Sequence, residues 1–343
     1  MYKEKKMIDE VIIHIGDHKA GSTSIQMAFH KQHVISPDLF YPDAHPDAKV
    51  PHNHNWYGRS TGQDYENVVM DHLKEQILNS GKSKAVISTA WYAYLNPKEL
   101  SDHINKHYRP IAKKVTVVRY LRPPLDYCRS VYVEMIKIAE ENVDFRTFFK
   151  NSSYKLPKYY DSIIEHHKQD YDIITRPFVK EALYKGDVVD DFLHICAGDD
   201  YEISKREISN PASCIQHLAI MKYFHERLED RNFDQVRDDG YFIWQALEQY
   251  FPIEDPIYFM MPEDIVNEVR FDPIYIEDAR KTDELISNGH TYLQDSLRDS
   301  ITKSVPYDMN LDIEDWYSRD IIALIKTFAR FYMISENRKL SSF

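Results

Sequence analysis

Four short runs of apolar and β-branched residues, each followed by a helical pattern, constrain the fold of this chain most. They lie at Val11–Ile15, Lys84–Ser88, Val115–Leu121 and Tyr171–Thr175. Short apolar runs of this kind are typical of strands that are buried on both faces. Strands that alternate with helices form parallel sheets covered by helices. The sequence therefore predicts a single α/β domain, with a parallel sheet flanked by helices over residues 8–205 and a mainly helical C-terminal extension over 206–343.

Helical patterns occupy most of the segments between and after these strands. They begin at Ser22, cover Asn67–Leu78, Pro97–Lys106 and Asp126–Ile138, start again at Asn210–Pro211, and end with Asp315–Glu336. Apolar residues recur there at spacings of three and four, and Asn-Pro is a helix-start signal. Residues Phe40–Gly62 hold Pro, Asn, His and Gly without periodicity, which predicts a loop.

The charge balance argues against a nucleic-acid partner. Of 343 residues, 43 are Lys or Arg and 55 are Asp or Glu, so the formal net charge is -12. Proteins that bind nucleic acid depend on basic surfaces for most of their affinity. The hydrophobic content of 43% is enough for a buried core.

Cysteine usage and hydropathy indicate a cytoplasmic protein without a membrane span. The three cysteines, Cys128, Cys196 and Cys214, show no CxxC spacing, so neither a disulfide framework nor a structural zinc site is predicted. The first ten residues are charged and lack the apolar stretch of a signal peptide. The most apolar late segment, Ile321–Ile334, contains Lys326 and Arg330 and is too short to cross a bilayer.

The first predicted strand leads into a loop that suits an anion. Lys19 lies at the apex of this loop (residues 16–24, the anion loop), and a group of small or hydroxylated residues follows: Ala20, Gly21, Ser22, Thr23 and Ser24. A strand-to-helix junction aims backbone N–H groups and the positive end of a helix at one point, which suits phosphate or sulfate. The alternative is an ordinary turn in which a Ser or Thr side chain caps the helix.

The anion loop differs from the phosphate loop of nucleotide triphosphatases. Gly16 and Gly21 have the separation found in that motif, but Ser22 stands where the motif has Lys. The strands at Val86 and Val115 end in Ser-Thr and in Arg122, not in the Asp that would hold magnesium. Magnesium-dependent ATP hydrolysis is therefore disfavoured, and a nucleotide-dependent kinase remains an alternative.

The anion loop resembles that of the PAPS-dependent sulfotransferases, approximately [ST]-x-P-K-[ST]-G-[ST]-T. PAPS is 3′-phosphoadenosine 5′-phosphosulfate, the sulfate donor of that family. The residues in register are Lys19, Gly21, Ser22 and Thr23. His18 stands where Pro is usual, and Ala20 stands where the family has a hydroxyl residue or Ala.

A second signature of that family follows the third main strand. The family has an Arg at the end of a strand and a Ser eight residues later, which together grip the 3′-phosphate, and here Arg122 precedes Ser130 by that spacing. A guanidinium makes forked contacts to phosphate, and a hydroxyl in the first turns of a helix adds a donor. The alternative is a surface ion pair between Arg122 and Asp126.

Weaker similarity extends over residues 10–225 and resembles bacterial sulfotransferase-like proteins. It includes Arg176-Pro177-Phe178, a helix with Asp-Phe-Leu, and an Asn-x-Ser helix. The resemblance implies a P-loop nucleotide-hydrolase-like sulfotransferase fold. Arg176 would either assist the cofactor or cap its strand.

The resemblance implies a transferase that moves a sulfuryl group from PAPS, without a metal, to a hydroxyl or amine. The acceptor would be a glycan, a lipid or a small hydroxylated metabolite. Lys19 would stabilise charge on the leaving phosphate and the transferring group. The rival from another class is a non-catalytic PAPS- or glycan-binding homologue.

The general base has three candidates, in the order His54, His52 and Glu134. The two histidines follow the first crossover helix, where a His-x-His resembles the pair in heparan and related 2-O-sulfotransferases. Glu134 lies four residues after Ser130 and shares its helix face. The histidines could instead be surface polar residues, and Glu134 could pair with Lys137 in solvent. Ala90 lies where many relatives have Glu or His, which leaves a catalytically impaired chain as an alternative.

Overall fold

The structure is a computed structural model that describes residues 7–17, 19–44, 53–54, 63–138, 140, 142–151, 156–206, 213–227 and 233–340. Within 63–65, 233–238 and 333–340 it describes the backbone only. The chain divides into two compact units. The first combines residues 1–124, 157–211 and 272–298, and the second combines 125–156, 212–271 and 299–343. The units therefore interleave along the chain, whereas the sequence analysis divides it once, after residue 205.

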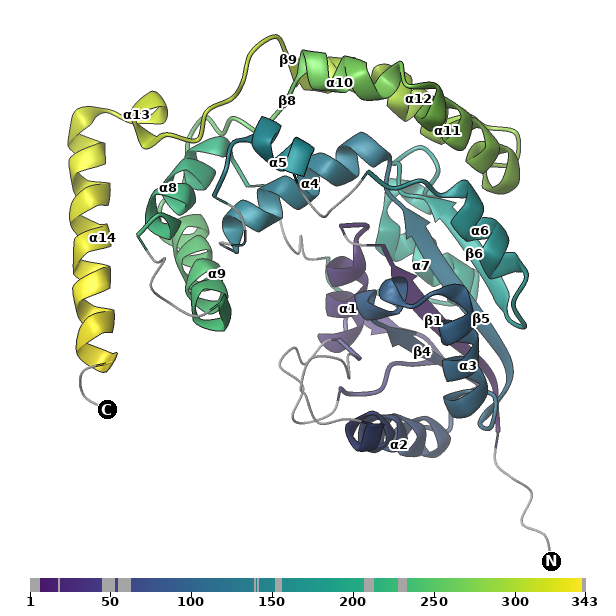
Figure 1. Ribbon diagram of the computed structural model, residues 1–343. Coiled ribbons are helices and arrows are strands. Elements are labelled where there is room, and N and C mark those ends of the chain that lie inside the picture. The colour runs from purple at the N-terminus through teal and green to yellow at the C-terminus, as the bar shows by residue number, and fades with distance from the viewer. Residues whose placement is uncertain are drawn as a thin grey trace, which may run out of the picture. The chain divides into compact units, whose positions relative to one another are not determined.

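The first unit contains a five-stranded parallel sheet (Figure 1). In sheet order its strands are β3 (Leu39–Phe40), β4 (Lys84–Ser88), β1 (Ile8–Gly16), β5 (Ala112–Leu121) and β6 (Asp172–Pro177). The predicted α/β fold with a helix-covered parallel sheet is confirmed. The short strand β3 falls at the edge of the predicted loop, and its pairing with β4 adds the outer strand on that side.

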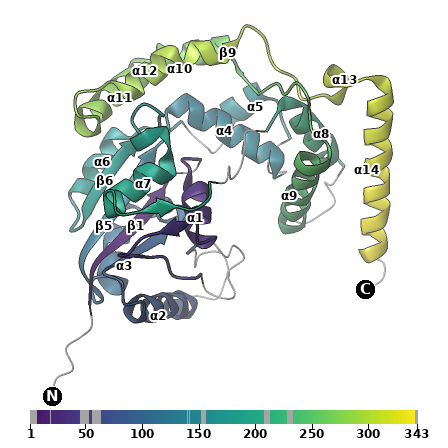
Figure 2. The ribbon, with the colours of Figure 1, turned by 180° about the vertical axis from the view of Figure 1, so that it is seen from behind.

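Helices cover both faces of this sheet, which explains why its strands are apolar throughout (Figure 2). On β1, Val11, Ile13 and Ile15 pack with α2 (Gln63–Asn79) and α3 (Pro97–His107). The intervening Ile12 packs on the opposite face with α1 (Ser22–His30) and α7 (Val188–Ala197). Alternate residues of one strand thus enter two separate cores, as the period of two requires. Three further helices of this unit are α6 (Tyr160–His167), α11 (Pro273–Ile286) and α12 (Tyr292–Asp299).

The strand order places a switch point beside β1. From β1 the chain turns to β3 and β4 on one side, and it then crosses to β5 and β6 on the other side. The connections that leave the carboxyl ends of β1 and β5 therefore run in opposite directions. In open α/β sheets, ligands bind at the carboxyl ends of the strands at such a point. The anion loop follows β1, and Arg122 follows β5.

The second unit is mainly helical. Its helices are α4 (Pro124–Lys137), α5 (Phe145–Asn151), α8 (Ile215–His225), α9 (Phe233–Tyr250), α10 (Glu263–Arg270), α13 (Ile313–Trp316) and α14 (Arg319–Leu340). Tyr132, Phe145 and Phe259 form an aromatic cluster in its core, with ring centroids 5.0 to 5.3 Å apart. The helix start predicted at Asn210–Pro211 lies outside the described residues. No helix in the described part of the chain has the length and apolar character needed to traverse a bilayer.

Candidate anion site

The anion loop turns sharply between β1 and α1. Lys19 and Gly21 both have left-handed backbone conformations, with φ of 65° and 82°. The amide of Ala20 donates to the carbonyl of Asp17 at 3.2 Å, and the Ala20 side chain is fully buried in the core beside α1 and α7. A left-handed residue other than glycine is uncommon and costs about 1–2 kcal/mol. The fold thus holds Lys19, at the apex of the loop, in a backbone conformation that a lysine residue does not favour.

Both glycines of the loop are closely packed, and at Gly21 the positive φ adds a second reason for glycine. A Cβ on Gly21 would lie 2.9 Å from Cε2 of Phe178 and 2.9 Å from Cγ1 of Val188. A Cβ on Gly16 would lie 1.9 Å from Oγ of Ser22. The turn therefore brings the Ser22 hydroxyl directly over the end of β1.

The N-terminus of α1 lacks the side-chain cap that α3 and α7 have. Asn96 caps α3 in a capping box, and Asp187 accepts bonds from two amides at the start of α7. The N-cap of α1 is Gly21, with no side-chain cap and no acidic residue in the first turn. Within the described residues, the buried Oγ of Ser22 has no hydrogen-bond partner. The first amides of α1 and this hydroxyl are therefore placed to bind an anion.

Arg122 extends from the end of β5 toward the anion loop. Its Nη1 donates a hydrogen bond to the carbonyl oxygen of Lys19, and its Cζ lies 5.6 Å from the centre of the Phe178 ring. The hydroxyl of Tyr159 donates to the carbonyl of Arg122 itself. The two segments that the sequence analysis singled out thus meet at the switch point. Asp126, the alternative partner of Arg122, forms ion pairs with Arg129 at 3.2 Å and Lys303 at 3.0 Å.

Ser130 lies on α4 and belongs to the second unit, whereas Arg122 belongs to the first. Their joint grip on a 3′-phosphate therefore stays a prediction. The spacing of eight residues and the position of Ser130 on the helix after β5 are as the sequence analysis expects.

Arg176, at the end of β6, pairs with a buried carboxylate. Its Nη2 lies 2.7 Å from Oδ1 of Asp191, a residue that is 2% exposed, and also donates to the carbonyl of Ala182. Asp191 further accepts the hydroxyl of Tyr120 at 2.8 Å and the amide of Tyr184 at 2.7 Å. These contacts favour the structural alternative, in which Arg176 joins the end of β6 to α7.

His54 is buried, and both of its ring nitrogens have partners. Nε2 donates to the carbonyl of Pro42 at 2.7 Å, and Nδ1 accepts the amide of Ser88 at 3.0 Å. Burial lowers the pKa of His54 to about 4, and the bond to Pro42 offsets only part of this effect. In this arrangement the imidazole is neutral and joins the segment after β3 to the end of β4. His52, the second candidate base, lies outside the described residues.

A buried polar network beneath the anion loop was not anticipated from the sequence. His14 of β1 is fully buried, and its Nδ1 lies 2.8 Å from Oγ of Ser88. Gln26 of α1 donates to the same Oγ at 3.2 Å. Burial lowers the pKa of His14 to about 3, so its ring is neutral at physiological pH. The sequence does contain a signal for this network, since His14 and Gln26 are polar residues at inward-facing positions of a strand and a helix.

Glu134 is engaged within the second unit. It accepts the hydroxyl of Tyr241 at 3.1 Å and pairs with Lys137 at 3.4 Å. Lys137 is 2% exposed, and its Nζ lies 3.5 Å from the centre of the Trp244 ring. The pair anticipated between Glu134 and Lys137 is present, but it is buried rather than in solvent.

Comparisons with known proteins leave the family open. No protein-family model matches the chain, and no curated protein matches it. Among solved structures, a sulfotransferase from Alicyclobacillus acidocaldarius is similar, with a TM-score of 0.40 and 14% identity. The match covers 82% of this chain and 98% of that one. At this TM-score the similarity supports no conclusion about activity, and the fold rests on the strand order described above.

Proposed function

We propose that the protein is a sulfotransferase that moves a sulfuryl group from PAPS to a hydroxyl or amine of a glycan, a lipid or a small metabolite. The observation that carries this proposal is the convergence of the anion loop and Arg122 at the switch point, where Arg122 contacts the backbone of Lys19. Two sets of anion-binding groups lie at neighbouring strand ends. They suit a molecule such as PAPS, which carries a phosphosulfate and a separate phosphate.

Each set has a distinct task in this proposal. The first amides of α1 and the hydroxyl of Ser22 hold the oxygens of the phosphosulfate, and the ammonium of Lys19 balances the charge that develops on the leaving phosphate. Arg122 and Ser130 bind the 3′-phosphate. The bond from sulfur to the bridging phosphate oxygen breaks as the acceptor's oxygen or nitrogen bonds to sulfur, and the acceptor's proton passes to a base. Alignment and charge stabilisation supply most of the catalysis in such transfers.

Two of the candidate general bases already have hydrogen-bond or ion-pair partners in the structure. His54 has both ring nitrogens engaged, and Glu134 is paired with Lys137. A base must come within hydrogen-bond reach of the acceptor's proton with a free lone pair. The proposal keeps His54, His52 and Glu134 as its candidate bases, and His54 and Glu134 would have to release these contacts to act.

Contacts at the ends of β1 and β4 argue against the alternative of a nucleotide-dependent kinase. Of the described residues in the anion loop, Asp17 carries a carboxylate, and that carboxylate pairs with Arg119 at 3.1 Å. The end of β4 presents Ser88, which bonds to His14. The strand β4 thus ends in Ser88 and not in the Asp that a magnesium–nucleotide site uses, and Arg119 holds Oδ1 of Asp17.

Calorimetric titration tests donor binding. We expect adenosine 3′,5′-bisphosphate to bind more tightly than ATP with magnesium, and Lys19→Ala to weaken bisphosphate binding at least tenfold. The matched control is Lys31→Ala at the other end of α1, which we expect to bind as the wild type does. A preference for ATP with magnesium would support the kinase and contradict the proposal.

A transfer screen with labelled PAPS tests catalysis. Glycans, lipids and hydroxylated metabolites serve as acceptors, and Lys19→Ala serves as the inactive control. Transfer that depends on Lys19 supports the enzyme. Tight bisphosphate binding without transfer to any acceptor class would support the non-catalytic homologue instead.

A further inference from the structure

Two histidines and a glutamate meet on the face of the sheet that α2 and α3 cover. His103 and His107 lie four residues apart on α3, so they share one side of that helix. Glu66 faces them from α2, with its Oε1 3.2 Å from Nδ1 of His103 and 2.8 Å from Nε2 of His107. One ligand atom from each of the three residues lies within 4.8 Å of the other two. The cluster is on the opposite face of the sheet from α1, and the proposed sulfuryl transfer does not use it.

These separations are close to those of a tetrahedral metal site. Zinc binds imidazole nitrogen and carboxylate oxygen at about 2.0–2.1 Å, which places neighbouring ligands about 3.3 Å apart. The distances from Glu66 to the two histidines lie near this value. Two histidines four residues apart on a helix, with a glutamate from a second helix, make up a recognised zinc ligand set. Two of the three ligand pairs thus already have the spacing of a tetrahedral site, and the two histidine nitrogens lie within 4.8 Å of each other.

A hydrogen-bond relay lies behind His103, away from Glu66. Nε2 of His103 is 3.0 Å from the hydroxyl of Tyr92, which is 2.7 Å from the hydroxyl of Tyr108. The hydroxyl of Tyr108 in turn lies 3.6 Å from the sulfur of Met70 and can donate to it. Both tyrosines are buried. Each phenol hydroxyl has one proton to donate and can also accept a hydrogen bond.

The relay has two proton arrangements, and one of them frees Nδ1 of His103 for a metal. In the first, Tyr108 donates to Tyr92, Tyr92 donates to His103, and the Nδ1 proton of His103 goes to Glu66. In the second, every donor reverses, so His103 donates from Nε2 to Tyr92 and Tyr108 donates to the sulfur of Met70. Nδ1 then faces the carboxylate with a lone pair, and a cation between them would bind to both groups. Ligating histidines commonly donate their other ring nitrogen in this way.

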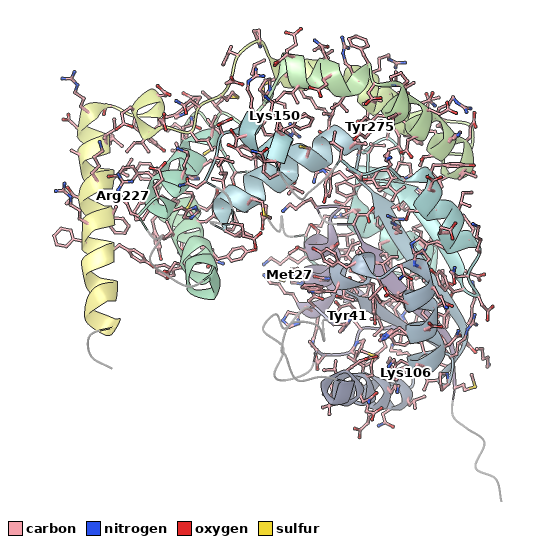
Figure 3. The ribbon with its side chains drawn as sticks, in the orientation of Figure 1. Met27, Tyr41, Lys106, Lys150, Arg227 and Tyr275 are labelled. Atoms are coloured by element: carbon pink, nitrogen blue, oxygen red, sulfur yellow. The ribbon has the colours of Figure 1, made fainter. Side chains whose placement is uncertain are left out.

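The surroundings of the cluster are half-open and carry one competing cation. Nζ of Lys106 lies 3.4 Å from Oε1 of Glu66, and Lys106 is exposed on α3 (Figure 3). Glu66 is partly exposed, which provides a path from solvent, whereas His103 and His107 are buried. Nδ1 of His107 is buried, with no hydrogen-bond partner in the described part of the chain.

We propose that Glu66, His103 and His107 form a binding site for Zn²⁺ or a chemically similar divalent ion, which fastens the first turns of α2 to α3. The carboxylate and two neutral imidazoles suit a borderline ion better than Mg²⁺ or Ca²⁺, which prefer oxygen ligands. The ion takes the place of Lys106 as the partner of Glu66. Its role is structural, because the cluster lies behind the sheet from the anion loop.

Equilibrium dialysis of the full chain against Zn²⁺, after treatment with a chelator, tests the site. We expect one equivalent to bind, and the visible spectrum of the Co²⁺ form to show tetrahedral coordination. Glu66→Gln, His103→Gln and His107→Gln should each weaken binding by more than about 100-fold, since even the loss of an outer-shell partner costs about 10–100-fold. His166→Gln is the matched control, because His166 is another buried helical histidine bonded to a tyrosine.

A variant of an exposed residue provides an independent test. Lys106→Ala removes the competing charge and should tighten Zn²⁺ binding about fivefold, the scale of one unit charge a few ångströms away in water. If either histidine variant proves unfolded by circular dichroism, Glu66→Gln and Lys106→Ala decide the outcome. Less than one equivalent of Zn²⁺ bound by the wild type, or unchanged affinity in Glu66→Gln and Lys106→Ala, would overturn the proposal.

Discussion

The guanidinium of Arg122 donates a hydrogen bond to the carbonyl oxygen of Lys19, which connects the ends of β5 and β1. This bond supports the left-handed backbone of Lys19 and keeps the guanidinium beside the anion loop. Arg122→Lys keeps the charge but cannot make a forked contact. We expect it to weaken binding of adenosine 3′,5′-bisphosphate at least tenfold, as measured by calorimetry. Arg129→Lys is the control, since Arg129 pairs with Asp126 on α4; an equal loss there would refute the assignment.

Lys19 should contribute to function and not to stability. Lys19→Gly removes the ammonium and also relieves the left-handed backbone, although glycine makes the unfolded chain more flexible. We expect the free energy of unfolding to stay within about 1 kcal/mol of the wild type. Sulfuryl transfer should fall by at least 100-fold, and Lys19→Ala should lose as much. Transfer at the wild-type rate in Lys19→Gly would contradict the proposed role of the ammonium.

Gly21→Ala should destabilise the first unit. The added methyl would meet Phe178 and Val188 at 2.9 Å, and the left-handed φ of 82° disfavours alanine. Overpacking costs about 1–3 kcal/mol, and the left-handed backbone costs alanine about 1–2 kcal/mol. Denaturant unfolding should show this loss. Gly81→Ala is a suitable control, because Gly81 also has a positive φ but a Cβ there would meet nothing within 4 Å.

The protein should lose stability as the pH falls below about 6.5. Burial lowers the pKa of His14 to about 3 and of His54 to about 4, so the unfolded chain binds these protons first. Between its pKa in the folded protein and about 6.5, each histidine lowers the free energy of unfolding by about 1.4 kcal/mol for every unit by which the pH falls. Denaturant unfolding at several pH values measures the slope. His54→Gln should reduce the slope by one proton, and an unchanged slope in this variant would contradict the assignment.

Arg176→Met should affect stability more than ligand binding. It leaves the buried carboxylate of Asp191 without its cationic partner, a change that costs about 3 kcal/mol when a buried pair is broken. The double variant Arg176→Met with Asp191→Asn should recover part of this loss. If Arg176→Met instead keeps its unfolding free energy and binds bisphosphate tenfold more weakly, Arg176 belongs to the cofactor site.

The sequence predicts the sheet well where a strand is buried on both faces. The runs at Val11–Ile15 and Val115–Leu121 lie within β1 and β5, and Lys84–Ser88 coincides with β4. The two-residue strand β3 has no periodicity of its own, because its pairing depends on where β4 lies in three dimensions. The alternation of strands and helices thus predicts the fold class, but not every strand at its edge.

The candidate site is only partly visible in the sequence. The anion loop is recognisable because a buried strand, small residues and a helix follow in order. The contacts of His54 cannot be recognised in the sequence, because the carbonyl of Pro42 and the amide of Ser88 come from separate segments. The spacing of His103 and His107 is a local signal that could have been used, whereas Glu66 is 37 residues away from the nearer of them.

The first unit draws on three separate stretches of the chain, and the last of them, residues 272–298, follows most of the second unit. Within it, Asp278 on α11 accepts the backbone amides of Tyr159 and Tyr160 at the start of α6. During synthesis on the ribosome, the start of α6 therefore lacks this carboxylate until α11 has been made. Nascent chains that stall before that helix should be substrates for chaperones and proteases, even though every residue of the anion loop has already emerged.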